Sequence, residues 1–285
     1  MKKIKLVLIL TIATLSFSSC NKSAEESLSG AEIIEGLKEA LKVGTDTASS
    51  KLSITNGYFK DQAVKLLLPE EITNSLNTFK SKSINVLGLG EITGADIYTK
   101  GIDLPGSNYD INALSSKEED LILGINRAAE SAAKDAGPIF WEAITDITIE
   151  DGSNILFGGV DNAATTYLDG KTRTNLFSKF EPKIDNALKS IKVGDKSVVT
   201  TYENYIGDYN AILNQIVPTS ITSTATIKSL MNMNTVQADD LSAYSTDKGL
   251  TGLFLKVADE EKNIRKNPFH RVTEILSKVF GELDK

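Results

Sequence analysis

Apolar residues recur every three or four positions from residue 31 to the end of the chain, and this spacing constrains the fold most strongly. Such a period lines up apolar side chains on one face of a helix, whereas a half-buried strand would need alternation. Ser29 and Glu32 form a capping box at the start of the first such segment. No spacing recurs at a longer fixed period, which excludes a solenoid. The sequence therefore predicts an all-α fold, an irregular multi-helix single domain over 31–285.

Later segments show the same apolar spacing but differ in the residues that begin or interrupt each helix. Two short helices are expected over Thr148–Leu156 and Asp161–Leu168, each opened by a capping residue. A longer helix is expected over Thr172–Ile191. Because Pro182 lies inside it and lacks a backbone N–H, we expect a break or kink near Phe180.

Two regions interrupt the helical texture. Five glycines fall between Gly88 and Gly106, interleaved with Asp and Asn. This density predicts a glycine-bearing loop insertion near 88–115, with any strand confined to a short hairpin there. The segment Thr219–Asp239 is rich in Ser, Thr and Asn and is expected to form a second loop.

The first twenty residues have the order of an export signal. A cationic start is followed by an apolar stretch over Leu6–Leu15, then by small residues and Cys20. The stretch is too short to span a bilayer, which takes roughly 20 residues. We interpret 1–19 as a lipoprotein signal peptide, with Cys20 as the acylated N-terminus of the mature chain. The alternative is ordinary secretion, with cleavage after Ser18.

This interpretation sets the expected location. The lipidated Cys20 would hold the protein on a membrane of the cell envelope, which we expect to be the outer membrane of a Gram-negative bacterium. Residues 20–30 are polar and predict a flexible tether. The pair Glu25-Glu26 resembles the acidic surface-export tags of some lipoproteins, although a solvated linker explains it equally. The sequence does not indicate whether the periplasmic or the outer face is used.

Charge and cysteine content exclude several classes. Removing the signal lowers the basic residues from 31 to 28 against 38 acidic residues, so the net charge changes from −7 to −10. This argues against nucleic acid as a partner, because nucleic-acid binding needs a cationic surface. Cys20 is the only cysteine, so the mature domain makes no internal disulfide and depends on a packed core.

The inventory of reactive side chains indicates no particular reaction. His270 is the only histidine, which leaves little for a catalytic triad or a zinc site. Gly88-Leu89-Gly90 lacks the context of a dinucleotide-binding loop. The sequence thus points to no catalytic residue, metal ligand or cofactor.

Three polar clusters remain as candidates. Solvated faces, an intrahelical pair and helix caps are the first interpretation of these clusters. The alternative is that some members converge in a polar groove that binds a ligand or an Mg²⁺ ion through carboxylates. The candidate groove residues are Arg127, Glu130, Asp151, Asp161, Glu261 and Arg265. Arg127 stands among alanines that permit close helix packing, so we expect its guanidinium to be buried against a carboxylate of Glu261 or Asp151.

Several blocks in order resemble a bacterial exported family, domain of unknown function 4197. The blocks are Asn126–Glu130, Thr148–Asp151, Asp161–Tyr167, Gly249–Phe254 and Glu260–Pro268. The resemblance covers roughly 33–281, and the chain departs from the family pattern near 88–115. It implies an α-helical exported protein and supplies no activity, substrate or catalytic residue.

Two functions follow as hypotheses. The first is a non-enzymatic, lipid-anchored envelope protein that binds an envelope protein or a small ligand through a helical groove. The alternative is a hydrolase or another carboxylate-dependent enzyme whose acids converge in that groove. Clustering of Arg127, Glu130, Asp151 and Glu261 in one cleft would favour the enzyme.

Overall fold

The structure is a computed structural model that describes residues 28–103, 110–111 and 113–285. Helices dominate these residues, and the strands are short antiparallel pairs, so the predicted all-α class is confirmed. The expected signal peptide, Cys20 and most of the tether lie outside the described residues.

The helices follow one another with short connections. They are α1 (Gly30–Leu52), α2 (Glu70–Lys80), α3 (Gly94–Lys100), α4 (Ser115–Ala133), α5 (Ala136–Asp146), α6 (Gly152–Phe157), α7 (Ala163–Ser190), α8 (Val198–Asn214), α9 (Ile227–Met231), α10 (Leu241–Lys266) and α11 (Glu274–Gly281). Two single 3-10 turns are η1 (Pro268–His270) and η2 (Glu282–Asp284).

The strands pair as β1 with β2, β3 with β4, β5 with β6 and β7 with β8. Their bounds are β1 (Ser83–Val86), β2 (Gly90–Thr93), β3 (Ile102–Asp103), β4 (Asp110–Ile111), β5 (Lys192–Val193), β6 (Lys196–Ser197), β7 (Ile216–Pro218) and β8 (Thr224–Thr226).

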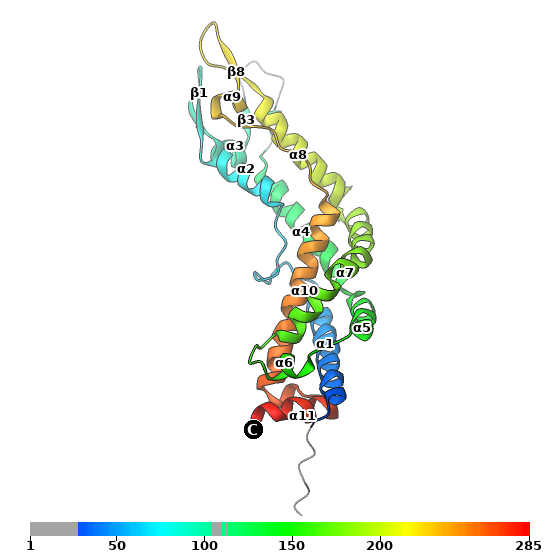
Figure 1. The fold of residues 1–285 in the computed structure, drawn as a ribbon. Coiled ribbons are helices and arrows are strands. Elements are labelled where there is room, and N and C mark those ends of the chain that lie inside the picture. The colour runs from blue at the N-terminus through cyan, green and yellow to red at the C-terminus, as the bar shows by residue number, and fades with distance from the viewer. Residues whose placement is uncertain (1–27, 104–109, 112) are drawn as a thin grey trace, which may run out of the picture.

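The body is elongated and gently curved (Figure 1). α11 and the start of α1 lie at one end, which we call the base. The hairpins β1–β2 and β7–β8 lie at the opposite end, which we call the tip. One backbone hydrogen bond of 2.8 Å, from Leu87 N to Pro218 O, joins the two hairpins at the tip.

The core is centred on α1, which packs along α10 although the two helices stand far apart in sequence. Small residues allow the close approach. A Cβ at Gly44 would lie 3.2 Å from Val257, and one at Gly36 would lie 2.7 Å from Val279 of α11. The buried side chains form one hydrophobic cluster that extends from the base to the tip. The described residues therefore share a single core.

A hairpin, β1–β2, forms near the expected place, with positive φ angles at Gly88 and Gly90 in its turn, but β1 lies before the predicted region 88–115. The restriction of strands to this region is wrong. β5–β6 turns through Gly194, whose φ is +63°, and β7–β8 ends in the segment expected to be a loop, with β7 before that segment and β8 within it. Both strand pairs are two or three residues long, too short for alternation to reveal them.

The expected helices over Asp161–Leu168 and Thr172–Ile191 are joined in one 28-residue helix, α7. The predicted break near Phe180 is not found, because α7 continues through Pro182, and the alternative of a kink there stays a prediction. Proline leaves the carbonyl four residues earlier without its helical partner. That carbonyl belongs to Ser178, and both residues are exposed, so water can satisfy it.

Among the described helices, none combines the length and the apolar character needed to cross a membrane.

Candidate functional site

The segment between α1 and α2, residues 53–69, is held in place by buried polar side chains of α4. Asn126 is fully buried and bonds to both backbone groups of Leu66. Its Oδ1 accepts from Leu66 N at 2.9 Å, and its Nδ2 donates to Leu66 O at 2.7 Å. The side-chain amide thus pairs with the backbone of Leu66 as a neighbouring strand would.

Glu130, one helical turn further along α4, fixes the other end of this segment. Its Oε1 accepts from the backbone N–H groups of Tyr58 and Phe59 at 3.2 and 3.1 Å. Its Oε2 accepts from Arg127 Nη1 at 2.5 Å, and Arg127 Nη2 donates to Asn56 Oδ1 at 2.9 Å. The predicted pairing of Arg127 with Glu261 or Asp151 is therefore not found.

Tyr58 connects the segment to α10. Its hydroxyl donates to Gly249 O at 2.7 Å, and burial raises the pKa of this hydroxyl, which keeps it a neutral donor. A Cβ at Gly252 would lie 2.7 Å from the Tyr58 ring. The two glycines of α10 thus make room for the ring and supply its acceptor.

A second polar cluster lies near the base. Glu261 of α10 is fully buried, and its carboxylate accepts from the N–H groups of Ala164 and Thr165 at 3.0 and 2.7 Å. The Thr165 hydroxyl adds a third bond of 2.7 Å. These N–H groups belong to the first turn of α7, where the helix dipole favours a negative charge.

Arg265 completes this cluster. Its Nη2 lies 2.7 Å from Glu261 Oε1, and its guanidinium also donates to the carbonyls of Ile155 and Leu156 at 3.0 and 2.8 Å. These carbonyls end α6, so the Glu261–Arg265 pair links the end of α6 to the start of α7.

The six predicted groove residues therefore lie in two places. Arg127 and Glu130 hold the 53–69 segment, whereas Glu261 and Arg265 hold the α6–α7 junction. Asp161 pairs with Lys266 at 2.5 Å beside that junction, and Asp151 caps α6 by accepting from Asn154 N at 3.0 Å. The residues do not converge in one groove.

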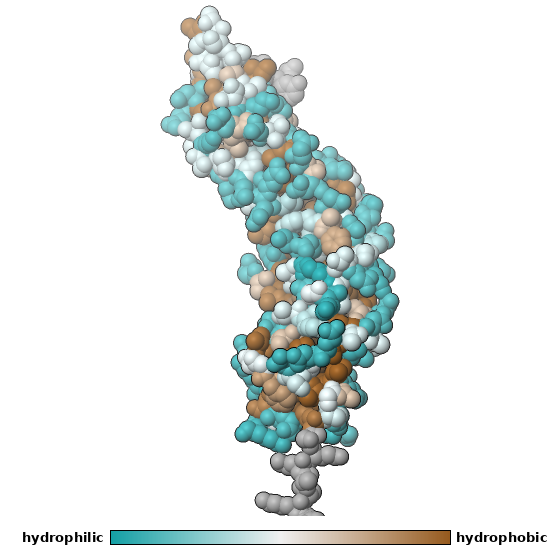
Figure 2. Space-filling view, in the orientation of Figure 1, coloured by the Kyte–Doolittle hydropathy of each residue, from teal (hydrophilic) through white to brown (hydrophobic). Residues whose placement is uncertain are grey.

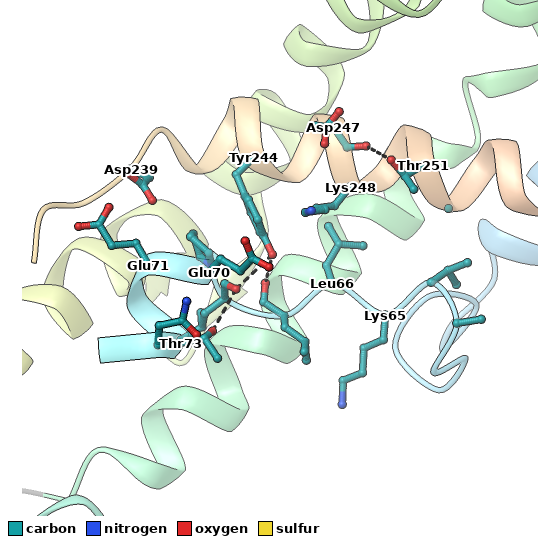
Figure 3. A pocket seen from close by; sticks show the side chains of 17 residues that line it. Lys65, Leu66, Glu70, Glu71, Thr73, Asp239, Tyr244, Asp247, Lys248 and Thr251 are labelled. Carbon is teal, nitrogen blue, oxygen red and sulfur yellow. Dashed lines mark hydrogen bonds between the residues drawn. The ribbon is translucent and has the colours of Figure 1, made fainter. Parts of the chain in front are cut away.

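A cleft with a volume of about 720 Å³ lies beside the 53–69 segment (Figure 3). The irregular run Ala63–Pro69, the first turns of α2 and the first half of α10 form its walls. The polar side chains that line it are Lys65, Glu70, Glu71, Thr73, Asn74, Asp239, Tyr244, Asp247, Lys248 and Thr251. Its size is that of a typical ligand-binding pocket.

Tyr244 extends from α10 to the opposite wall of this cleft (Figure 3), where its hydroxyl donates to Leu67 O and Leu68 O at 3.0 and 3.1 Å. Burial, with the nearby Glu70 and Asp247 carboxylates, raises the pKa of Tyr244 to about 12. The hydroxyl therefore stays protonated and holds the two walls together.

The cleft carries an acidic lining. Four carboxylates, from Glu70, Glu71, Asp239 and Asp247, face two lysines in the lining set. Arg173 of α7 reaches Asp247 at 2.8 Å from outside that set. The lining set therefore carries a net charge of −2, and of −1 when Arg173 is included, so the cleft stays mildly acidic.

None of these cleft residues is among the six predicted groove residues. Pro69 is the signal that could have revealed the cleft wall, because a residue before proline favours an extended conformation.

The family model for a protein of unknown function, DUF4197, matches residues 27–88 and 108–281. The chain belongs to this family. Residues 89–107 fall between the two matched stretches, inside the region where the sequence departs from the family pattern. No curated protein and no solved structure matches the chain.

The blocks that resemble the family coincide with the two polar clusters. Asn126–Glu130 and Gly249–Phe254 hold the 53–69 segment, whereas Asp161–Tyr167 and Glu260–Pro268 form the α6–α7 junction. In this member of the DUF4197 family, these residues therefore fix the architecture.

The arrangement of the carboxylates in the two polar clusters suits structural hydrogen bonding and binding better than proton transfer. Both oxygens of Glu130 and both oxygens of Glu261 accept hydrogen bonds from other groups of the protein, so both carboxylates act as structural acceptors in the described structure. Within the described ranges, no three His, Cys, Asp or Glu side chains gather closely enough to hold a metal ion.

Proposed function

We propose that this protein is a lipid-anchored component of the bacterial cell envelope that binds a partner in the α2–α10 cleft. The order of the first twenty residues, which ends in Cys20, supports the anchor. The partner is an envelope protein or a small ligand, and the carboxylates of the cleft favour one that carries an amine or a guanidinium group.

The binding role is supported mainly by the buried polar side chains that hold the 53–69 segment beside the cleft. Burying Asn126 and Glu130 costs free energy unless each finds partners, and both find them in the 53–69 segment. That irregular segment forms one wall of the cleft. The protein therefore holds an irregular segment in place beside two helices, as a preorganised binding surface requires.

The enzyme alternative is weaker on the same grounds. The candidate acids sit in two separate clusters, and Glu261 has no exposed surface. A general acid or base must come within hydrogen-bond reach of its substrate. We therefore propose that the protein acts by binding and that the cleft is its binding site.

The anchor is tested in cells by metabolic labelling with an alkyne fatty acid and by membrane fractionation. The wild-type protein should carry the label and sediment with membranes, whereas Cys20→Ala should lose both. A mature protein that begins at Ser19 and carries no fatty-acid label would establish ordinary secretion instead.

The cleft is tested by photo-crosslinking in living cells. A photoreactive amino acid at Glu71, an exposed residue of the cleft, should give a discrete adduct. The matched control is the same amino acid at Glu203, exposed on α8 and outside the cleft. The charge-reversed pair Glu70→Lys and Asp239→Lys should abolish the adduct at position 71. Equal adducts at positions 71 and 203 would contradict a specific cleft.

A further inference from the structure

Two surface turns near the base expose large apolar side chains. One follows α6 and presents Phe157 and Val160, which are 51% and 53% exposed. The other follows α10 and presents Phe269 and Val272, which are 92% and 68% exposed. We call these the basal turns.

The basal turns lie beside each other because α10 ends against the α6–α7 junction. Lys266, which precedes the second turn, pairs with Asp161 of the first at 2.5 Å. Arg265 bonds to the carbonyls of Ile155 and Leu156, immediately before Phe157. Figure 2 shows hydrophobic residues on the surface at this end of the body, as well as at the tip.

Hydrogen bonds and ion pairs hold the turn that carries Phe269 in place. His270 Nδ1 lies 2.6 Å from Glu260 Oε1 on α10. The buried Arg271 guanidinium donates to Ile264 O and Arg265 O, both at 3.0 Å, and pairs with Asp284. The Phe269 N–H donates to Asn267 Oδ1 at 3.1 Å. An exposed phenyl ring opposes the hydrophobic effect, so a fixed turn that presents one indicates an apolar surface as its partner.

The connection to Cys20 identifies that surface. Seven residues lie between Cys20 and Leu28, the first described residue, and the eight steps along the chain can span at most about 28 Å. Leu28 leads directly into α1, whose first turns contact α6 and α11 at the base. An acyl group on Cys20 would therefore hold the base within one short tether of the bilayer.

We propose that the basal turns insert into the surface of the membrane that holds the acyl chains of Cys20. This inference rests on the proposed lipid anchor and adds a second, non-covalent contact to it. A single acyl chain binds a membrane weakly, and additional apolar contacts strengthen attachment. The contact also fixes the orientation of the body, with its base down and the tip away from the bilayer.

The charges near the basal turns favour a neutral lipid surface over an anionic one. Lys262 and Lys266 lie on α10 before the second turn, while Asp161 and Glu274 flank the same region. Because both signs are present, attachment depends on burial of apolar side chains and changes little with salt or with the content of anionic lipid.

The test exploits the single cysteine of the chain. The mature protein that begins at Cys20 is coupled through its thiol to a maleimide-bearing lipid in phosphatidylcholine vesicles. In a Trp141→Phe background, Phe269→Trp supplies the only tryptophan. On coupling, its emission should shift to shorter wavelength and be quenched by lipids with brominated chains.

The matched control is Ile221→Trp in the same background, because Ile221 lies in the β7–β8 turn at the tip and is 93% exposed. Its emission should be the same on the vesicle as in solution. An unshifted Phe269→Trp, equal shifts in both variants, or a shift at the tip alone would each overturn the inference. Far-ultraviolet circular dichroism of both variants verifies their fold.

Because the maleimide lipid takes the place of acylation, the vesicle experiment tests the insertion of the basal turns independently of the proposed lipid anchor. If cells do not acylate Cys20, the proposed anchor fails whatever the vesicles show. If cells acylate Cys20 and the coupled Phe269→Trp does not shift, the anchor stands and the insertion of the basal turns is wrong.

Discussion

The Glu261 carboxylate of α10 accepts hydrogen bonds from Ala164 and Thr165 of α7 and from Arg265 of its own helix. Arg265 extends this buried cluster to the end of α6. A carboxylate at the N-terminus of α7 interacts favourably with the helix dipole, and Arg265 balances its charge. Such a pair contributes less to stability than its contacts suggest, since both ions lose their hydration on burial. Its larger effect appears when one partner is removed.

Replacing Glu261 should therefore destabilise the protein strongly. We expect Glu261→Ala to lower the free energy of unfolding by about 3–5 kcal/mol, because Arg265 is left buried and uncompensated. Urea denaturation followed by circular dichroism measures this change. Asp161→Asn, which removes an exposed pair with Lys266 at the same junction, is the control and should change stability little. Similar effects of the two variants would contradict the central role of Glu261.

Arg127 is less buried, so its removal should cost less. Arg127→Ala removes the bonds to Glu130 and Asn56 and should lower the free energy of unfolding by about 1–3 kcal/mol. Arg127→Lys should restore only part of this loss, because a lysine cannot reach both acceptors with a planar fork. A change below about 0.5 kcal/mol, typical of a surface substitution, would show that Arg127 has no structural role.

The polar clusters were visible in the sequence, but their partners were not. Arg127 and Glu130 stand three residues apart on one helix, and local spacing alone predicts that they meet. Glu261 pairs with Arg265 for the same reason. The backbone groups of Tyr58, Phe59 and Thr165 are distant in sequence, so only the tertiary fold brings them to these carboxylates.

At the scale of elements, the junction of α1 with α11 depends on pH. Glu32 accepts from the backbone N–H of Ser29 at 2.8 Å and pairs with Lys278 of α11. The bond from Lys278 is the main cause that lowers the pKa of Glu32 to about 2, with smaller contributions from Ser29. A lowered pKa means that the folded state favours the ionised carboxylate.

The sign of the pH dependence follows. The stabilisation by Glu32 is complete above the ordinary pKa of 4.5 and is lost as the pH falls through about 2. We expect Glu32→Gln to lower the melting temperature at pH 7 and to match the wild type near pH 2. Calorimetry at several pH values measures this, with Glu203→Gln as a control that follows the wild type throughout. A constant difference between Glu32→Gln and the wild type would contradict the assignment.

Elements defined by local signals were predicted better than those defined by tertiary contacts. The Ser29–Glu32 capping box forms as expected, because its bonds lie within one turn. The continuous α7 was missed because the cost of Pro182 is a local penalty that packing of Phe180 and Ile184 on the same helix outweighs. The cleft was missed because Ala63–Pro69 has no helical or alternating pattern.

At the scale of the whole molecule, the elongated body should be measurable in solution. A compact globular chain of this length has a radius of gyration of about 18 Å. Because the base and the tip lie at opposite ends of a curved body (Figure 1), the mature chain should give a clearly larger value by small-angle X-ray scattering. A radius of about 18 Å would show that the tip folds back on the body in solution.

The packing of α1 on α10 also has a consequence for the export that we propose above. About 190 residues separate the end of α1 from the start of α10, and α11, which packs on α1 at the base, is the last α-helix in the chain. Contacts between such distant segments form slowly, since a long loop must close first. The core therefore cannot close until nearly the whole polypeptide has been made. A nascent chain that cannot form its core early stays unfolded, and an unfolded chain is the form that can pass through a narrow protein-conducting pore.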